Sequence, residues 1–329
     1  MKDRIYWIDI ARGMAILFVI FGHAFLNSDV KIVVYMFHMP LFFFISGFFL
    51  CNKDLSFKSF LLKKFKTVLF PYYFWGVILI VYWWLISIIQ GINVSVLRSI
   101  LDLLICNRNA SLVHSILWFL CCLFVTEIIV FTLCKISAKR RWLIGGGITI
   151  IGLVYNHYFN VLMPFCIDTA LIASGFMMVS IFIKDHYGLK SIFTSKFTLF
   201  LSIAIYLIIL LANVFLLGNN CVSMSSNLYE PYLLFYLGSM AGIYICSFTS
   251  KVIGRNNILE FWGRNSLLAY ALNYAVIFPV SIIINHLFRR FGMFNLIVQD
   301  AMTFIFSICI IALLIKMINK HFIWSTGKF

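Results

Sequence analysis

The sequence predicts an all-α membrane protein, a polytopic bundle of about ten transmembrane helices, and three observations lead to this fold class. Hydrophobic residues make up 63% of the chain and charged residues only 11%, whereas soluble domains carry about a quarter charged residues. Apolar runs recur along the chain with roughly the 17–25 residues that a bilayer requires. Basic residues gather in the short loops between these runs. We therefore expect residues 1–329 to form a single membrane domain, with no soluble domain.

The apolar runs define the expected helices in chain order. The first carries Asp9 and Arg12 and shows no small-residue cleavage pattern, so it is expected to be a span rather than a signal peptide. The third begins at a basic cluster followed by Pro71. A polar stretch over 93–114 is expected to be an outer loop or re-entrant segment, and the boundary between the fifth and sixth spans, within 142–183, is not fixed by the pattern. The expected spans lie near residues 5–26, 32–50, 67–90, 114–134, 142–158, 161–183, 196–217, 231–249, 262–287 and 294–318.

Loop charge predicts the orientation of these spans. Basic residues concentrate in the loops on one side of the expected bundle, and the opposite loops hold a single lysine between them. Since basic loops stay in the cytoplasm, both termini are expected to be cytoplasmic, in the plasma (inner) membrane of a bacterium. The same topology explains the formal net charge of +15 without a nucleic-acid partner. The basic loops are 51–66, 135–141, 184–196 and 251–264, the opposite loops are 27–31, 155–160 and 218–230, and the arginines that fall on the outer side are Arg98, Arg108, Arg289 and Arg290.

The nine cysteines predict neither a disulfide framework nor a metal site. Most lie within or at the ends of apolar runs, and no two have the C-x-x-C spacing. They are therefore expected to act as small apolar residues, and no metal cofactor is expected.

The first apolar run places two candidate functional side chains on one helix. Arg12 and His23 are eleven residues apart, which in an α-helix is about 20° from a whole number of turns and about 16 Å of rise. Both should therefore face the same way, one toward each side of the bilayer. Asp9, three residues before Arg12, can pair with it and lower the cost of burying the charge.

Two interpretations of this helix stay open at this point. In one, Arg12 reaches the cytoplasmic interface and His23 caps the outer end beside Asn27 and Ser28. In the other, His23 is a general base near the outer face, because histidine transfers protons near neutral pH. Arg12 would then anchor a thioester or anionic ligand from the inner side, because a guanidinium binds phosphate and carboxylate oxygens.

A second candidate lies in the segment Phe37-His38-Met39-Pro40-Leu41-Phe42-Phe43-Phe44-Ile45-Ser46-Gly47. His38 lies just across a short outer loop from His23, so the two histidines can meet at one depth. Two histidines without a third carboxylate or thiolate make a weak metal site, and an acid–base or hydrogen-bonding role is favoured for His38. Ser46 is a candidate substrate-binding or structural polar residue. The alternative is a helix-entry proline beside a hydrogen-bonded interfacial histidine.

A third candidate is the basic cluster Lys63, Lys64 and Lys66 at the start of the third span. The concentration of positive charge in cytoplasmic loops accounts for any one of these lysines. Three lysines in four positions at the start of a helix also make a cradle for anions, suited to the phosphates of a nucleotide-like donor.

A fourth group consists of polar or aromatic residues within the apolar runs, each a candidate for a substrate-binding or structural role. Trp118 stands at the start of a span, which is typical of an interfacial aromatic belt. Glu127 and Asp168 lie deep in apolar sequence and should face the bundle interior or a cavity. Asn265 is expected to cap the ninth span.

Together these segments resemble the acyltransferase-3 family of multispanning membrane O-acyltransferases. The resemblance covers nearly the whole chain. Ile8–Ala15 with Gly22-His23 resembles the family's opening pattern of Asp, Arg-Gly and a histidine after ten intervening residues. Phe37–Gly47 closely resembles its His-Met-Pro-Leu-Phe-Phe-Phe-x-Ser-Gly element. Weaker matches are the basic-to-proline stretch over 63–72, Trp118-Phe119 and Gly263–Tyr270, and the chain looks most similar to the branch of sugar O-acetylases such as fucose acetylases.

The resemblance implies an acyl-CoA donor, usually acetyl-CoA, that enters from the cytoplasm, and an acceptor hydroxyl on a lipid-linked or exported glycan. By resemblance, Arg12 and His23 match the family's essential pair, and His38 matches a frequent partner. Some relatives carry basic residues three apart where this chain has Lys63 and Lys66, and lysine cannot bind phosphate with the bidentate geometry of arginine.

The resulting hypothesis is an O-acyltransferase in contact with membrane lipids that moves an acyl group, acetyl by resemblance, from acyl-CoA to a saccharide hydroxyl. The donor phosphates would lie near the lysine cluster, the pantetheine arm would reach toward Arg12, and the thioester would lie near the two histidines. His23 would deprotonate the acceptor hydroxyl or form a transient acyl-histidine, and the sequence does not choose between these. Many relatives have histidine where this chain has Asn273, so no proton role is assigned there.

The alternative from another class is a proton-coupled transporter or flippase of a polar or glycolipid substrate, with Asp9, Arg12, His23, Glu127 and Asp168 as a proton relay. This alternative gives no reason for the lysine cluster, and the sequence shows no internal repeat of the transporter type. A sensor or structural membrane protein would leave the intramembrane charges without a role.

Overall fold

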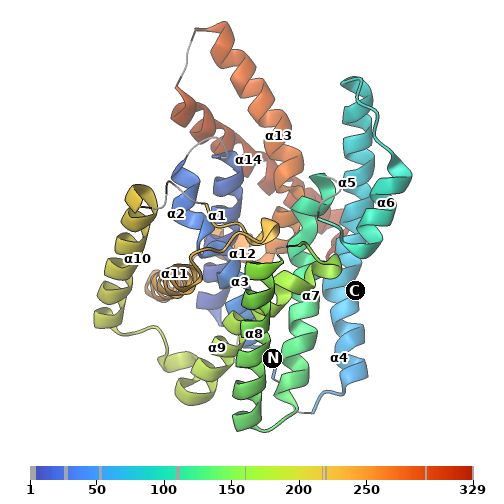
Figure 1. Ribbon diagram of the computed structural model, residues 1–329. Helices are drawn as coiled ribbons and strands as arrows, with labels where there is room; N and C mark the ends of the chain where they lie inside the picture. Colours follow the sequence, from blue (N-terminus) through green and yellow to red (C-terminus); the bar gives the residue numbers. More distant parts are fainter. Residues whose placement is uncertain are drawn as a thin grey trace. The chain divides into compact units, whose positions relative to one another are not determined.

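The computed structural model is built from helices (Figure 1). It describes residues 5–25, 29–51, 54–108, 112–159, 161–216, 218, 221–292 and 295–327, without the side chains of 112–115 and 190. Within these ranges there are fourteen α-helices and no named strand. The two-residue bridge between Ser223 and Leu228 is isolated. The prediction of an all-α protein is confirmed.

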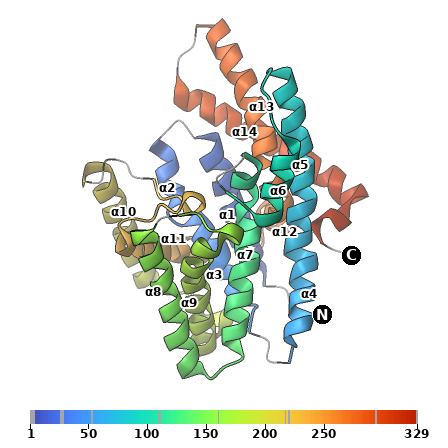
Figure 2. The same cartoon turned by 45° about the vertical axis from the view of Figure 1, so that its right-hand side comes forward.

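Nine segments within the described ranges are long and apolar enough to cross a bilayer, which confirms a polytopic membrane bundle. Each matches an expected span. Several contain more than one helix, as where α4, the π-helical turn η2 and α5 follow one another along a single rod (Figure 2). The nine are α1 (Tyr6–Ala24), η1–α2–α3 (Asp29–Lys31, Ile32–Tyr35, His38–Gly47), α4–η2–α5 (Phe57–Lys64, Phe65–Leu69, Phe70–Ile89), α7 (Leu112–Cys134), η3–α9 (Pro164–Cys166, Ile167–Ser191), α10 (Lys196–Leu216), α11 (Tyr232–Ile253), α13 (Ser266–Arg290) and α14 (Leu296–His321).

The fifth expected span, near 142–158, folds as α8 (Ala138–Tyr158) but is not among these nine. Its first turn carries Lys139, Arg140 and Arg141, and three glycines follow at 145–147, so α8 is less apolar than the nine segments above. The orientation of the termini stays a prediction.

Three boundaries differ from expectation because short helices extend into segments expected to be loops. The basic loop over 51–66 contains α4, whose first turn is capped by Ser56. The polar stretch over 93–114 contains α6 (Val96–Ile105), capped by Ser95. The ninth expected span is divided at Asn265 into α12 (Asn257–Arg264) and α13. The side chains of Ser56, Ser95 and, before α12, Asn256 accept from backbone N–H groups that the first turn of a helix leaves without partners.

The chain divides into two compact units, each drawn from separate stretches of sequence. Residues 1–42, 187–223 and 228–320 form one unit, which we call the histidine unit because it contains His23 and His38. Residues 43–186, 224–227 and 321–329 form the other, which we call the lysine unit because it contains Lys63, Lys64 and Lys66. Each unit is described by itself, and the expectation of a single membrane domain stays a prediction.

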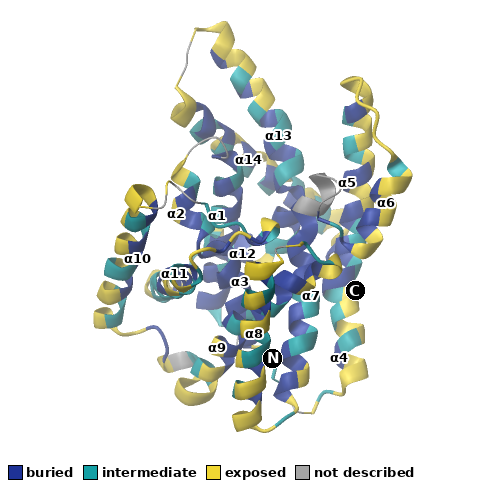
Figure 3. Ribbon diagram, viewed as in Figure 1, coloured by how far each residue is buried: buried dark blue, intermediate teal, exposed yellow. Residues whose placement is uncertain are grey.

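Burial shows which helices form the interior of each unit (Figure 3). In the histidine unit, α1 is largely buried and packs closely on α12, where Gly13 and Gly263 face one another. A Cβ at either glycine would collide with the backbone of the other helix, which is the reason small residues are enriched where membrane helices meet. By contrast, α10 and α14 are mostly exposed, as expected for helices that face lipid.

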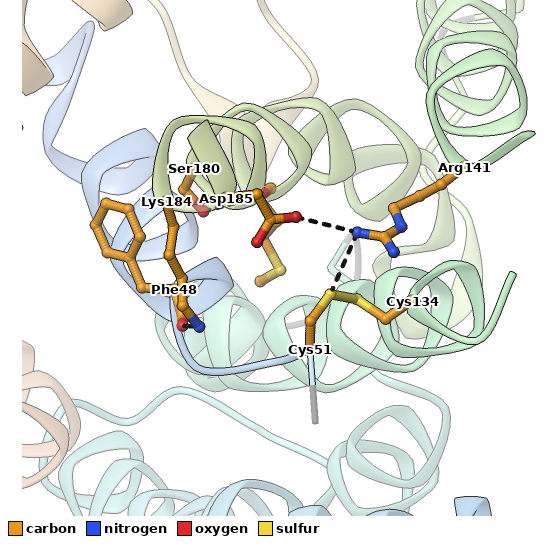
Figure 4. Close-up of a disulfide and its surroundings, with 8 residues drawn as sticks. Phe48, Cys51, Cys134, Arg141, Ser180, Lys184 and Asp185 are labelled. Atoms are coloured by element: carbon orange, nitrogen blue, oxygen red, sulfur yellow. Dashed lines mark hydrogen bonds and ion pairs between the residues drawn. A yellow bond between two sulfur atoms is a disulfide. The ribbon is translucent and has the colours of Figure 1, made fainter. Parts of the chain in front are cut away.

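The structure contradicts the expectation that the cysteines form no disulfide. Cys51, four residues after the end of α3, and Cys134, the last residue of α7, lie in the lysine unit and are joined with a Cα–Cα distance of 5.4 Å (Figure 4). Beside them, Arg141 Nη1 lies 3.5 Å from a carboxylate oxygen of Asp185. The two cysteines are 83 residues apart, so spacing alone could not identify the pair. The remaining seven cysteines are free, and five of them are buried, as expected for small apolar residues.

Candidate active site

Helix α1 carries Arg12 and His23 on one side, as the eleven-residue spacing predicts. Both side chains are half-buried, and Ile16 and Val19, which lie between them on the same side of the helix, are buried. Met14, Phe18 and Phe21, which are also half-buried, lie around the opposite side. Arg12 and His23 therefore share one side of α1.

Two histidines and two tyrosines form a cluster in the histidine unit. The His23 ring lies 5.9 Å from the ring of Tyr274 on α13, and the His38 ring lies 5.1 Å from the ring of Tyr35 on α2, both edge-on. Tyr35 also lies against Gly22, which directly precedes His23. That the two imidazoles meet at one depth stays a prediction.

A backbone contact fixes the tautomer of His38. Its Nδ1 lies 2.7 Å from the carbonyl oxygen of Val34, and because a carbonyl only accepts, Nδ1 must carry the hydrogen. The free lone pair of neutral His38 is therefore on Nε2. The whole side chain of His38 is 5% exposed.

His23 differs from His38 in both contacts and exposure. Its ring is half-buried, and its Nδ1 is buried with no hydrogen-bond partner among the described residues. Of the two histidines, His23 is the more exposed.

Sequence reasoning missed both tyrosines of this cluster. Gly22, directly before His23, lies against the Tyr35 ring so closely that a Cβ there would collide with it. Tyr35 is three residues before His38, a spacing that could have placed both on one side of a helix. Tyr274 follows Asn273 in a span far along the chain, and the sequence carries no signal that it meets His23.

Asp9 contacts α12, and Asn265 binds other partners than a helix cap would. The expected pairing of Asp9 with Arg12 stays a prediction. Asp9 is 9% exposed, and one of its carboxylate oxygens lies 4.0 Å from Nε of Arg264, whose guanidinium also pairs with Glu260. Asn265 precedes α13 but makes no capping bond. Its side chain donates to the carbonyl oxygen of Phe261 (2.8 Å) and accepts from Asn319 (2.7 Å). Asn265 therefore ties α12 to α14, and its expected capping role is wrong.

The lysine cluster is not a uniform cradle. Lys64 Nζ lies 2.6 Å from Oε1 of Glu127, which is buried on α7, so the charge of Lys64 is neutralised inside the lysine unit. Lys63 and Lys66 are exposed. The helix widens to a π-helical turn over Phe65–Leu69, a local irregularity that recurs at functional sites. Two of the three lysines therefore remain available to an anion.

Asp168 faces the interior of the lysine unit, one of the two placements predicted for it. It forms an ion pair with Arg108, whose side chain is 1% exposed, and accepts from Asn227 Nδ2 (2.6 Å). Arg108 also donates to Thr169 Oγ1 (2.8 Å) and to the carbonyl oxygen of Ser225 (3.0 Å). These contacts support a structural role for Asp168. They also give a buried partner to Arg108, one of the four arginines that the expected topology places on the outer side.

The other two candidates also lie in the lysine unit. Trp118 is 6% exposed and packs edge-on against Phe119 (6.1 Å between ring centroids). This burial supports a place in the core rather than in an interfacial belt. Ser46 is half-buried near the end of α3.

Comparison with known proteins gives one result of substance. The model of a family described as an acyltransferase domain matches residues 5–318 of the chain. No curated protein and no solved structure gives a significant match. The match covers α1 to α14 almost completely and includes every candidate residue above.

Proposed function

Because the chain belongs to the acyltransferase-3 family, a family of membrane acyltransferases, we propose that it transfers an acetyl group from cytoplasmic acetyl-CoA to a hydroxyl of a lipid-linked or exported saccharide. The observation that carries this proposal is the pair of imidazoles in the histidine unit. One belongs to a half-buried residue, His23, and the other belongs to the buried His38 and is held in a single tautomer.

We assign His23 the role of general base in this reaction. The acceptor oxygen attacks the thioester carbonyl carbon, a carbon–oxygen bond forms and the carbon–sulfur bond breaks. The hydroxyl proton passes to His23 Nε2 and then to the departing thiolate, which leaves as coenzyme A. A transient acyl-histidine would use the same side chain.

His38 and Arg12 support this step in different ways. His38 is buried with its Nδ1–H bound to Val34, so its lone pair is on Nε2, and we assign this atom to stabilise the proton that His23 receives. Arg12, about 16 Å along the same side of α1, is assigned to bind the oxygens of the donor.

Mass spectrometry of the host's surface glycans tests the proposal. Glycans from cells that contain the protein should be heavier by one acetyl group per modified saccharide than glycans from cells that lack it. Identical glycan masses in the two strains, with the protein present in the membrane, would remove the saccharide acceptor from the proposal.

The lysine cluster gives a prediction about donor binding. The double variant Lys63→Gln/Lys66→Gln should raise the Kd for acetyl-CoA up to about tenfold at low salt, because two exposed charges near the donor phosphates are lost. The difference should shrink as salt is added. Lys64→Gln is the matched control, since the charge of Lys64 already faces Glu127. This variant should lower the thermal stability and leave the Kd for acetyl-CoA within about twofold of the wild-type value. Equal weakening by both variants would contradict these separate roles.

The charged contacts disfavour the transporter alternative. Asp9, Glu127 and Asp168 face Arg264, Lys64 and Arg108, respectively. Each carboxylate thus has a nearby cation that stabilises its charged form, whereas a relay needs groups that take up and release protons in turn.

A further inference from the structure

Helix α14 has a buried side that is polar over its first half. Gln299, Asp300, Thr303 and Ser307 are buried there at helical spacing, and the exposed residues of the helix are mostly apolar. Further along the same side, the buried residues are the apolar Ile311 and Ile315. Polar side chains inside a membrane span are costly to keep without partners. The polar half therefore calls for an explanation.

Two contacts place α14 beside α1 and α13 within the histidine unit. The Phe304 ring lies 5.6 Å from the ring of Phe21 on α1, and Asn319 donates to Asn265 at the start of α13. Phe21 is less than one turn before His23, and His23 meets Tyr274 on α13. Asp300 and Ser307 lie within about one turn of Phe304, and Asn273 directly precedes Tyr274, so all three lie next to these contacts.

Three buried side chains in this region carry a polar atom with no hydrogen-bond partner among the described residues. They are Asp300 Oδ2, Ser307 Oγ and Asn273 Oδ1. Asn273 and Ser307 are 0% exposed and Asp300 is 8% exposed. The Nδ2 of Asn273 donates to the carbonyl oxygen of Tyr270, which identifies its other atom as the oxygen. Thr303, by contrast, donates its hydroxyl to the carbonyl oxygen of Gln299 (2.9 Å).

The chemistry of these atoms selects the partner. A carboxylate oxygen and an amide oxygen only accept, and a serine hydroxyl can do so. A group that satisfies all three must supply several hydrogen-bond donors, as the hydroxyls of a saccharide do. We propose that Asn273, Asp300 and Ser307 form a subsite for a neutral, polyhydroxylated part of the acceptor, and this proposal rests on the proposed function.

The subsite lies apart from the reacting group. Phe21, which meets α14, is two residues from His23 and so points to the opposite side of α1. We therefore assign the subsite to a sugar unit other than the one that reacts at His23, which makes the acceptor an oligosaccharide rather than a single sugar.

Binding of de-O-acetylated oligosaccharides from the host's surface glycan to the purified protein tests the subsite. Ser307→Ala and Asp300→Asn should each raise the Kd about three- to tenfold, because each removes a protein oxygen that accepts a hydrogen bond from the ligand. Ser307→Ala should also raise the melting temperature of the ligand-free protein, since it removes a buried hydroxyl that has no partner. Thr303→Val is the matched control and should leave the Kd unchanged.

The outcomes separate the subsite from the proposed function. If the wild-type protein binds no oligosaccharide, or binds it equally in all variants, the subsite is wrong, even where acetyl-CoA is consumed. The subsite also fails if Ser307→Ala lowers the ligand-free melting temperature, or if tetramethylammonium, a cation without hydroxyls, binds through Asp300 in place of the oligosaccharide. If binding depends on these residues but acetyl-CoA is never used, the subsite stands and acyl transfer fails.

Discussion

Replacing His23 with alanine is expected to lower acyl transfer by at least about 10²–10⁴-fold, the contribution of a positioned general base. The imidazole assigned as the base would be lost, and we do not expect His38, buried and bound to Val34, to replace it. The measurement is the acetyl content of surface glycans, with the amount of protein in the membrane determined in the same cells.

A control for this variant is available in the same unit. His286 on α13 is exposed and lies outside the cluster around His23. His286→Ala should therefore keep wild-type acetylation. Full product from the His23→Ala protein would exclude His23 as the base and as an acyl carrier.

The largest loss of stability is expected from Asp168→Ala. The variant would leave the Arg108 guanidinium, 1% exposed, without its counter-charge. Removing one partner of a buried ion pair costs about 3–5 kcal/mol. The loss should appear as a lower midpoint of unfolding in detergent.

Two further variants establish the cause of this loss. In Arg98→Ala the lost partner of Asp102 is a side chain that is 72% exposed, so the cost should stay below about 1 kcal/mol. The double variant Arg108→Met/Asp168→Leu removes both charges and should recover much of the stability lost in Asp168→Ala. A midpoint for Asp168→Ala equal to that of wild type would show that the pair contributes nothing to the fold.

Much of the fold is predictable from local patterns. Hydropathy gives nine of the ten expected spans, because a bilayer demands long apolar runs wherever the chain crosses it. Helical periodicity also predicts that Arg12 and His23 share one side of α1. The same patterns miss α4. The charge rule predicts a loop wherever lysines gather, although lysine is also a good helix former.

The pairings that complete the candidate site are not predictable in this way. Lys64 meets Glu127 across 63 positions, and His23 meets Tyr274 from the other end of the chain. Such contacts depend on which helices become neighbours, and no spacing within one helix carries that information. The cap expected at Asn265 is wrong for the same reason, because Asn319 of α14 takes the side-chain oxygen.

The packing of α1 between Arg12 and His23 has a consequence for the permeability of the membrane. Ile16 and Val19, at 0% and 1% exposure, separate the two polar positions. Water that reaches the arginine from one end of the helix is thus kept from the histidine at the other by apolar side chains. Under the proposed function the donor and the acceptor lie in different compartments, and these two residues would keep water and ions from crossing the membrane along this side of α1.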